Sequence, residues 1–238
     1  MKLILNYGKD RTYSPTKLFE SPSGYDETGA VNGNLEIRGM NGQELPAGLV
    51  VRGDLIISDY ELKALPEVLT VQGSLVINMS SITALGGITK IGRHLIIKNS
   101  PLESLPEKLK VGKGIKLENT RLKQFPSSLK RVNGSFSIIN TPLSCLPKDL
   151  KVGGCLHIGA RTALSELPEG LNVKAKVLLR ESEIIRIPRK VYIGSDLRLP
   201  IKCIAEIHED AVIKGSIFGE FTLTNNSKDF ILRIWDDS

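Results

Sequence analysis

The chain has 238 residues, of which 41% are hydrophobic and 24% are charged, a composition typical of a water-soluble protein with an apolar core. Its formal net charge is +6, and it has no apolar run of about 18 residues, which argues against a membrane-spanning helix. The first ten residues lack the continuous apolar core of a signal peptide, so export by the general secretory pathway is not expected.

The three cysteines, Cys145, Cys155 and Cys203, are odd in number and form no CxxC pair. No histidine stands at a metal-binding interval from them. We therefore expect free thiols in a reducing compartment such as the cytoplasm, with no bound metal and no cofactor.

Residues 1–32 do not repeat and contain four aromatic residues, Tyr7, Tyr13, Phe19 and Tyr25. An array of repeats needs covers at its ends, and aromatic, atypical terminal segments provide them. We predict an N-terminal cap here, with a separate functional element as the alternative.

A period of 20 residues, lengthened to 21 at two steps, runs through residues 33–222 and predicts about ten stacked coils. Each coil has a short strand that begins with an apolar anchor, and a second apolar residue follows two positions later on the same face, except at Gly219. Because one coil cannot bury its own apolar edge, neighbouring strands should be parallel and in register. The anchors are Leu35, Leu55, Leu75, Leu95, Ile115, Phe136, Leu156, Val177, Leu197 and Ile217.

Three other positions recur in each coil. A glycine two or three residues before nearly every anchor predicts a corner that needs a positive φ or close backbone packing. An apolar pair such as Leu109 and Val111 predicts a second short strand, and a Leu-Pro pair such as Leu105-Pro106 excludes helix from that side. Hydroxyl residues five places after the anchor should hydrogen-bond between successive coils; they are Ser80, Ser100, Thr120, Thr141 and Ser182.

Residues 223–238 follow the array and contain an alternating stretch from Phe230 to Trp235, which we predict to be a C-terminal cap. The predicted organisation is thus a cap at 1–32, a solenoid at 33–222 and a cap at 223–238.

The order L-x-L-x-x-[N/T/S]-x-L-x-x-L-P, seen in residues 115–126, resembles the short leucine-rich repeats of type III secreted bacterial effectors and of some phage proteins. The resemblance covers residues 33–222, but Ser or Thr stands where Asn is usual, and a Val-Gly corner precedes the anchor. It implies a mainly β, leucine-rich-repeat fold, for which a two-sheeted right-handed parallel β-solenoid is the alternative. It also implies a non-enzymatic adaptor or inhibitor, placed in a host cytosol if specialised secretion delivers it.

Side chains one and three residues after each anchor should point outward from the strands. In the first of these rows, Ile56, Val76 and Ile96 form an apolar stripe on three adjacent coils. An apolar centre with a polar edge is typical of a protein-binding surface. The alternative is that β-branched residues are simply favoured in strands. The polar residues we assign to the same surface are Asn78, Lys98, Lys116 and Glu118.

Basic residues are concentrated between residues 83 and 131, where eleven stand against three acidic ones. This excess favours an acidic partner, either a protein surface or, as the second choice, nucleic acid. The charges fall on several sides of the coils without interleaved aromatic residues, which argues against nucleic acid, and a solvated face remains open. Besides Lys98 and Lys116, the basic patch comprises Lys90, Arg93, Lys108, Lys110, Lys113, Arg121, Lys123, Lys130 and Arg131.

Catalytic motifs such as GxSxG, HExxH and the Walker loop are absent, so we do not expect an enzyme. Cys155 and His157 lie two positions apart on one strand and are a weak candidate for a thiol site, with chance proximity as the alternative. Only 16 residues follow the array, too few for the ligase domain that some effectors carry after their repeats.

Overall fold

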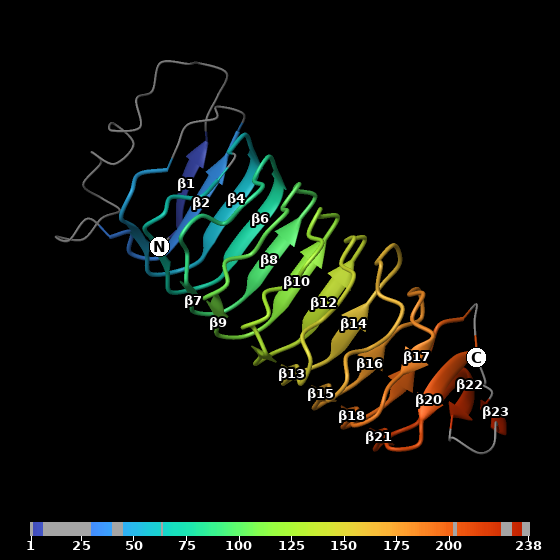
Figure 1. Ribbon diagram of the computed structural model, residues 1–238. Helices are drawn as coiled ribbons and strands as arrows, with labels where there is room; N and C mark the ends of the chain where they lie inside the picture. The colour runs from blue at the N-terminus through green and yellow to red at the C-terminus, as the bar shows by residue number, and fades with distance from the viewer. Residues whose placement is uncertain are drawn as a thin grey trace. The chain divides into compact units, whose positions relative to one another are not determined.

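The computed structural model describes residues 2–6, 30–39, 45–62, 64–201, 204–224 and 230–234. The chain divides into two compact units, Met1–Leu122, called unit 1, and Lys123–Ser238, called unit 2. All elements in the described residues are strands, and together the two units contain about nine solenoid turns, close to the ten expected. The predicted parallel β-solenoid is therefore confirmed (Figure 1).

Unit 1 contains two parallel sheets, one of long strands and one of short strands. Pairs such as Leu55 with Leu75 and Leu75 with Leu95 show that neighbouring long strands are in register. The long strands are β1 (Lys2–Asn6), β2 (Asn34–Arg38), β4 (Leu55–Tyr60), β6 (Leu75–Ser80), β8 (Leu95–Lys98) and β10 (Ile115–Glu118). The short strands are β3 (Leu49–Val51), β5 (Leu69–Val71), β7 (Lys90–Ile91) and β9 (Lys110–Val111).

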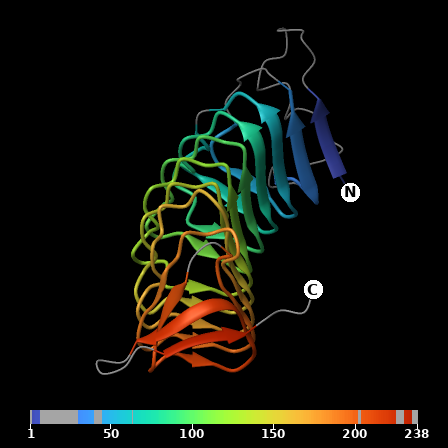
Figure 2. The ribbon, with the colours of Figure 1, turned by 90° about the vertical axis from the view of Figure 1, so that its right-hand side faces the viewer.

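Unit 2 repeats this two-sheeted arrangement, as the parallel rungs in Figure 2 show. Its first sheet contains β12 (Phe136–Ile139), β14 (Leu156–Ile158), β16 (Val177–Leu178), β19 (Leu197–Arg198) and β22 (Ile217–Thr224). The second contains β11 (Arg131–Val132), β13 (Lys151–Val152), β15 (Asn172–Val173), β18 (Tyr192–Ile193) and β21 (Val212–Ile213). Two further strands, β17 (Arg186–Ile187) and β20 (Ala205–His208), are parallel to each other, and β20 pairs with the second half of β22.

The anchor columns form the core of each unit. In unit 1 the anchors from Leu35 to Ile115 are at most 2% exposed, and in unit 2 those from Phe136 to Leu197 are fully buried. Each fully buried side chain of this size contributes about 1.5–3 kcal/mol, so stacking is favourable at every step of the array. Ile217, the last anchor, is only half-buried, as expected for the last coil.

The corner glycines Gly92 and Gly112 allow successive coils to approach closely, and their φ angles are not positive, unlike the φ of 105° at Gly33 in the first coil. A Cβ on Gly92 would lie 1.8 Å from the carbonyl oxygen of Gln72, and one on Gly112 would lie 2.0 Å from that of Gly92. Of the two explanations offered by the sequence, close backbone packing is therefore the right one at these positions.

Two columns of polar side chains hydrogen-bond between coils. Among the expected hydroxyls, Ser80 Oγ donates to the carbonyl of Tyr60 at 2.9 Å, and the N–H of Ser80 donates to Ser100 Oγ at 3.2 Å. Other hydroxyls of this column donate within their own coil, which differs from the expectation: Ser100 Oγ to Lys98, Thr141 Oγ1 to Ile139 and Ser182 Oγ to Leu179. The second column, one residue before the anchor, was not expected to link coils.

In that second column a side chain on one coil accepts a hydrogen bond from the backbone N–H of the next coil. Asp54 Oδ1 accepts from the N–H of Ser74 at 2.6 Å, and His94 Nδ1 accepts from the N–H of Gly114 at 3.2 Å. His94 thus has a structural role in unit 1, which the sequence did not indicate.

The failure of the repeat at Gly219 coincides with a change of sheet. Residues 217–218 of β22 pair with β19, whereas residues 221–224 pair with β20. Gly219, with a φ of 119°, lies between these segments, at a backbone angle that suits glycine alone.

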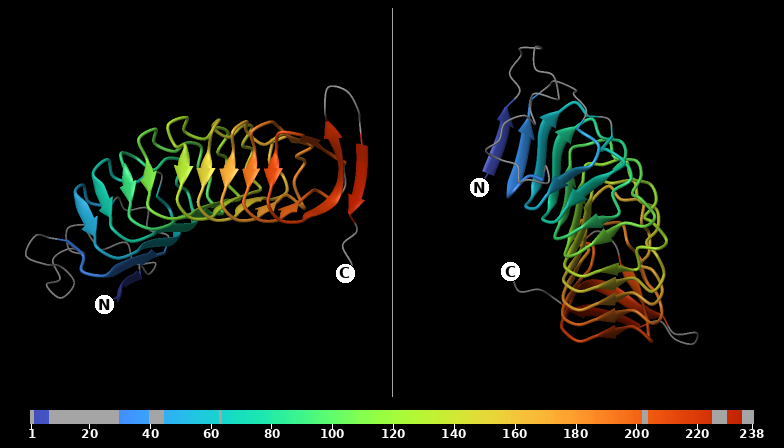
Figure 3. Two further views of the ribbon diagram at one scale, coloured as in Figure 1. Left: turned by 90° about the horizontal axis from the view of Figure 1, so that it is seen from below. Right: turned by 90° about the vertical axis from the view of Figure 1, so that its left-hand side faces the viewer.

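The two segments predicted as caps lie largely outside the described residues. In residues 1–32 the structure describes β1 and residues 30–32, and β1 is a parallel strand paired in register with β2. In residues 223–238 it describes the end of β22 and β23 (Phe230–Ile234), which is antiparallel to β22 (Figure 3). Trp235 lies outside the described residues.

Candidate binding surfaces

The apolar stripe expected from the sequence lies in one row across β4, β6 and β8. Ile56 pairs with Val76, and Val76 pairs with Ile96, in the parallel register. All three side chains are half-buried, whereas their neighbours Ile57, Ile77 and Ile97 are fully buried, as strand alternation requires. The row thus presents apolar surface to solvent.

Charged residues stand at both ends of this row. Lys116 pairs with Ile96 on one side, and Glu36 pairs with Ile56 on the other. Glu36 is only 1% exposed and forms an ion pair with Arg38 of its own strand. The row is therefore an apolar centre with polar ends.

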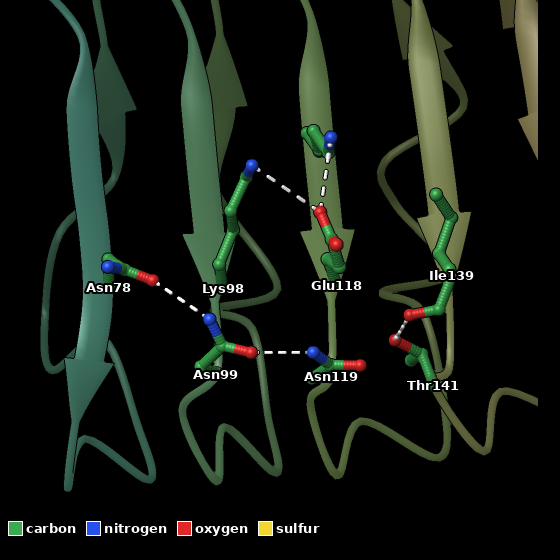
Figure 4. A network of polar contacts seen from close by, with 8 residues as sticks. Asn78, Lys98, Asn99, Glu118, Asn119, Ile139 and Thr141 are labelled. Atoms are coloured by element: carbon green, nitrogen blue, oxygen red, sulfur yellow. Dashed lines mark hydrogen bonds and ion pairs between the residues drawn. The ribbon is translucent and has the colours of Figure 1, made fainter.

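Lys98, Lys116 and Glu118 form one network on β8 and β10 (Figure 4). Glu118 Oε2 lies 3.1 Å from Lys116 Nζ and 3.5 Å from Lys98 Nζ. The hydrogen bond from Lys116 is the largest factor that holds the pKa of Glu118 below its ordinary value, and Lys98 adds to it. Because one carboxylate serves two lysines, the network keeps a single positive charge.

Asn78 belongs to a ladder of amide side chains that the sequence reasoning did not identify (Figure 4). Asn99 Nδ2 donates to Asn78 Oδ1 at 3.0 Å, and Asn119 Nδ2 donates to Asn99 Oδ1 at 2.5 Å. The ladder runs along the ends of β6, β8 and β10, beside the charged network.

Backbone geometry explains why amides stand at two of the three ladder positions, Asn99 and Asn119, but not at Asn78, which lies three places after its anchor. The residue four places after the anchor has a positive φ in successive coils, with values of 48° at Asn99 and 53° at Asn119. Asn and Asp tolerate this left-handed conformation better than other non-glycine residues. Asp59, Asn99, Asn119 and Asn140 stand at this position, a column visible in the sequence, although Met79 breaks it.

The residues of the basic patch fall on several sides of the coils, and all except the half-buried Lys98 and Lys116 are exposed. Lys90 and Lys110 pair in register across β7 and β9, and the N–H of Lys113 donates to the carbonyl of Arg93 at the neighbouring corner. Lys108 lies in the turn before β9, and Arg121 follows β10. The remaining three residues, Lys123, Lys130 and Arg131, belong to unit 2.

His157 lies in β14, and Cys155 directly precedes that strand. The N–H of Cys155 donates to Ser135 Oγ at 3.1 Å, a contact between coils. Cys145 and Cys155 are free, and Cys203 lies outside the described residues. No cluster of three His, Cys, Asp or Glu side chains in the described part of the chain is arranged to hold a metal ion. Among the same residues, no helix is long and apolar enough to cross a membrane.

Comparisons of the chain with models of known protein families, with curated proteins and with solved structures gave no match. A function therefore has to be inferred from these surfaces alone.

Proposed function

We propose that the protein binds a partner protein through the unit 1 strand face, which comprises Ile56, Val76, Ile96, Asn78, Lys98, Lys116 and Glu118. The observation that carries the proposal is the in-register row of three half-exposed apolar side chains on adjacent strands. Protein interfaces commonly have such an apolar core surrounded by polar groups.

The polar groups define the chemistry of the partner. The network of Lys98, Lys116 and Glu118 keeps one positive charge, and the amide ladder offers donors and acceptors beside it. A complementary partner has an apolar patch with an acidic edge. Paired strands or the residues that directly follow them hold these groups, so we expect little ordering when the partner binds.

In this proposal the protein is a non-enzymatic adaptor or inhibitor. Its free thiols Cys145 and Cys155 fit a reducing compartment, the cytoplasm or a host cytosol reached by specialised secretion. The likeness of its coils to short bacterial leucine-rich repeats is consistent with a binding role, because solenoid surfaces vary freely on a constant core.

Capture of proteins from the native host tests the proposal. Ile56→Asp, Val76→Asp and Ile96→Asp, combined in one chain, should abolish capture of a partner that the wild type retains, because three carboxylates would disrupt the apolar centre. The matched control combines Val68→Asp, Ile185→Asp and Ile204→Asp, three exposed apolar residues outside this face. Both variants should keep the circular dichroism of the wild type. If the control loses the partner equally, or the strand-face variant retains it, the proposal is wrong.

Nucleic-acid binding through the basic patch is the second candidate, favoured by the in-register pair of Lys90 and Lys110 with Arg93 and Lys113 nearby. Release of counterions predicts a steep loss of affinity for DNA or RNA between about 50 and 200 mM salt. Lys90→Glu with Lys110→Glu should abolish that binding. If the wild type slows the electrophoretic migration of neither DNA nor RNA at low salt, this candidate fails.

A further inference from the structure

The strand face of unit 2 contains a hollow lined mainly by charged residues, unlike the apolar stripe of unit 1. Its volume is about 380 Å³. His157, Leu178 and Arg198 form one row across it, because His157 pairs with Leu178 and Leu178 pairs with Arg198 in the parallel register. The remaining lining residues are Lys176, Arg180 and Glu181.

Three of the six lining side chains are cations and one is a carboxylate, so the hollow is positively charged. Lys176 is partly neutralised, since its Nζ lies 3.0 Å from Asp196 Oδ2. The second oxygen of Asp196 accepts a hydrogen bond from the N–H of Ser216 at 3.2 Å. Both oxygens of Asp196 thus accept hydrogen bonds from other groups. The hydrogen bond from Lys176 is the largest of the contributions that lower the pKa of this carboxyl, and the charge of Arg198 makes only the last of them.

Arg198 contacts an aromatic ring, and no side chain or carbonyl among the described residues accepts a hydrogen bond from its guanidinium. Its Cζ lies over the ring of Phe218, 5.0 Å from the centroid. A cation–π contact leaves the N–H groups of a guanidinium available for hydrogen bonds with other groups. Arg198 lines the hollow and therefore offers hydrogen-bond donors to an anion bound there.

We propose that this hollow binds a small organic anion. The N–H groups of Arg198 hold its carboxylate or phosphate head, with Arg180 and Lys176 adding positive potential, and Leu178 contacts its apolar part. A planar guanidinium forms two parallel hydrogen bonds with either head group. The volume lies at the lower end of the range of about 300–1,000 Å³ typical of small-molecule sites. This inference does not depend on the function proposed for the unit 1 strand face.

Titration calorimetry on the full chain tests the site with three probes of one size. Phenyl phosphate and benzoate carry the two candidate head groups, and benzyl alcohol is the neutral control. We expect saturable binding of at least one anion at concentrations up to about 10 mM and none of the alcohol. The anion that binds with the higher affinity shows whether the site prefers a phosphate or a carboxylate head group. The absence of saturable binding of both anions, or equal binding of the alcohol, overturns the proposal.

Two variants separate a specific site from general attraction by a basic protein. Arg198→Gln should lower the affinity for the preferred anion about tenfold or more, because hydrogen bonds between charged partners are lost. Arg186→Gln removes the same charge from unit 2, at an exposed arginine that pairs with Glu206 outside the hollow, and should change the affinity less than about twofold.

A third variant keeps the positive charge at position 198 and keeps the test valid if Arg198→Gln does not fold. Arg198→Lys should retain the circular dichroism of the wild type and still bind the anion several-fold more weakly, because an ammonium cannot form the two parallel hydrogen bonds. If Arg198→Gln and Arg186→Gln weaken binding equally, or if Arg198→Lys binds as tightly as the wild type, Arg198 is not the recognition group and the proposal is wrong.

Discussion

In unit 1 the outward row beside the buried anchors contains Ile56, Val76 and Ile96, whereas in unit 2 the same row contains His157, Leu178 and Arg198. One row is apolar, and the lysines beside it share a carboxylate. The other row lines a positively charged hollow. The anchors of the same strands and the residues two places after them are alike in both units, because all of them are buried aliphatic residues.

This difference shows which positions of the coil are constrained. An inward residue contacts the coils before and after it, so any polar replacement there would be buried without a partner. An outward residue contacts solvent on one side and can change with little effect on stacking. Two distinct surfaces can therefore occur on one repeated core.

Truncation of equivalent core residues should produce the largest loss of stability. It tests whether the cores of the two units are equivalent. Ile77 of unit 1 and Leu179 of unit 2 stand two places after their anchors and are fully buried. Ile77→Ala and Leu179→Ala should each cost about 2–5 kcal/mol of unfolding free energy, because each leaves a cavity in the stack. Urea unfolding followed by circular dichroism measures the loss.

The matched controls are the outward neighbours on the same two strands. Val76→Ala and Leu178→Ala remove half-exposed side chains and should cost less than about 1 kcal/mol. A cost at Val76 equal to that at Ile77 would mean that the two faces of β6 are not distinguished as described.

Corner glycines should produce the next largest effect, again in both units. A Cβ on Gly112 would lie 2.0 Å from the carbonyl oxygen of Gly92, and one on Gly194 would lie 2.2 Å from that of Lys174. Gly112→Ala and Gly194→Ala should each destabilise the protein by about 1–3 kcal/mol through overpacking, measured as a lower urea midpoint.

Gly48 separates the steric effect from the conformational one. It has a φ of 80°, and no atom lies within 4 Å of its hypothetical Cβ. Gly48→Ala should therefore cost only the left-handed backbone strain, about 1 kcal/mol. If Gly112→Ala and Gly194→Ala lose no more unfolding free energy than Gly48→Ala, successive coils do not approach as closely as described.

The buried part of both units could be predicted from the sequence because burial repeats with the coil. The anchor column and the parallel register are confirmed, and the apolar pair of Leu109 and Val111 correctly indicated a second short strand, β9. The same core position excludes polar side chains in every coil. Ten apolar residues in one column therefore clearly indicate which position is buried.

The polar surface was harder to predict because it depends on the partners that individual side chains choose. Asn78, Lys98, Lys116 and Glu118 were all assigned to the surface, yet their pairing depends on side-chain torsions that no repeat fixes. The column of Asn99 and Asn119 at positive φ could have been found, since Asn and Asp recur four places after the anchor. The hollow at Arg198 has no equivalent in the repeat pattern.

The smallest expected effect concerns the charged network that distinguishes the unit 1 strand face. Glu118 has a pKa below its ordinary value of about 4.5 in the folded protein, chiefly through its hydrogen bond with Lys116. A carboxyl with a lowered folded pKa stabilises the protein above its unfolded pKa, and this contribution is lost as the pH falls through the folded pKa. Glu118→Gln should therefore reduce stability at pH 7 by less than about 1 kcal/mol, because solvent screens these half-exposed groups.

The pH dependence of this small difference identifies its cause. Urea midpoints of the wild type and of Glu118→Gln should converge as the pH falls through the lowered pKa of Glu118, because this carboxyl then becomes protonated. Glu103→Gln removes one exposed carboxylate from the same unit outside the network, and its midpoint should match the wild type at each pH. A difference at Glu118 that persists unchanged at low pH would assign its effect to packing of the side chain. The charge balance of the unit 1 strand face would then not depend on this carboxylate, and the contrast with the positively charged hollow of unit 2 would be weaker.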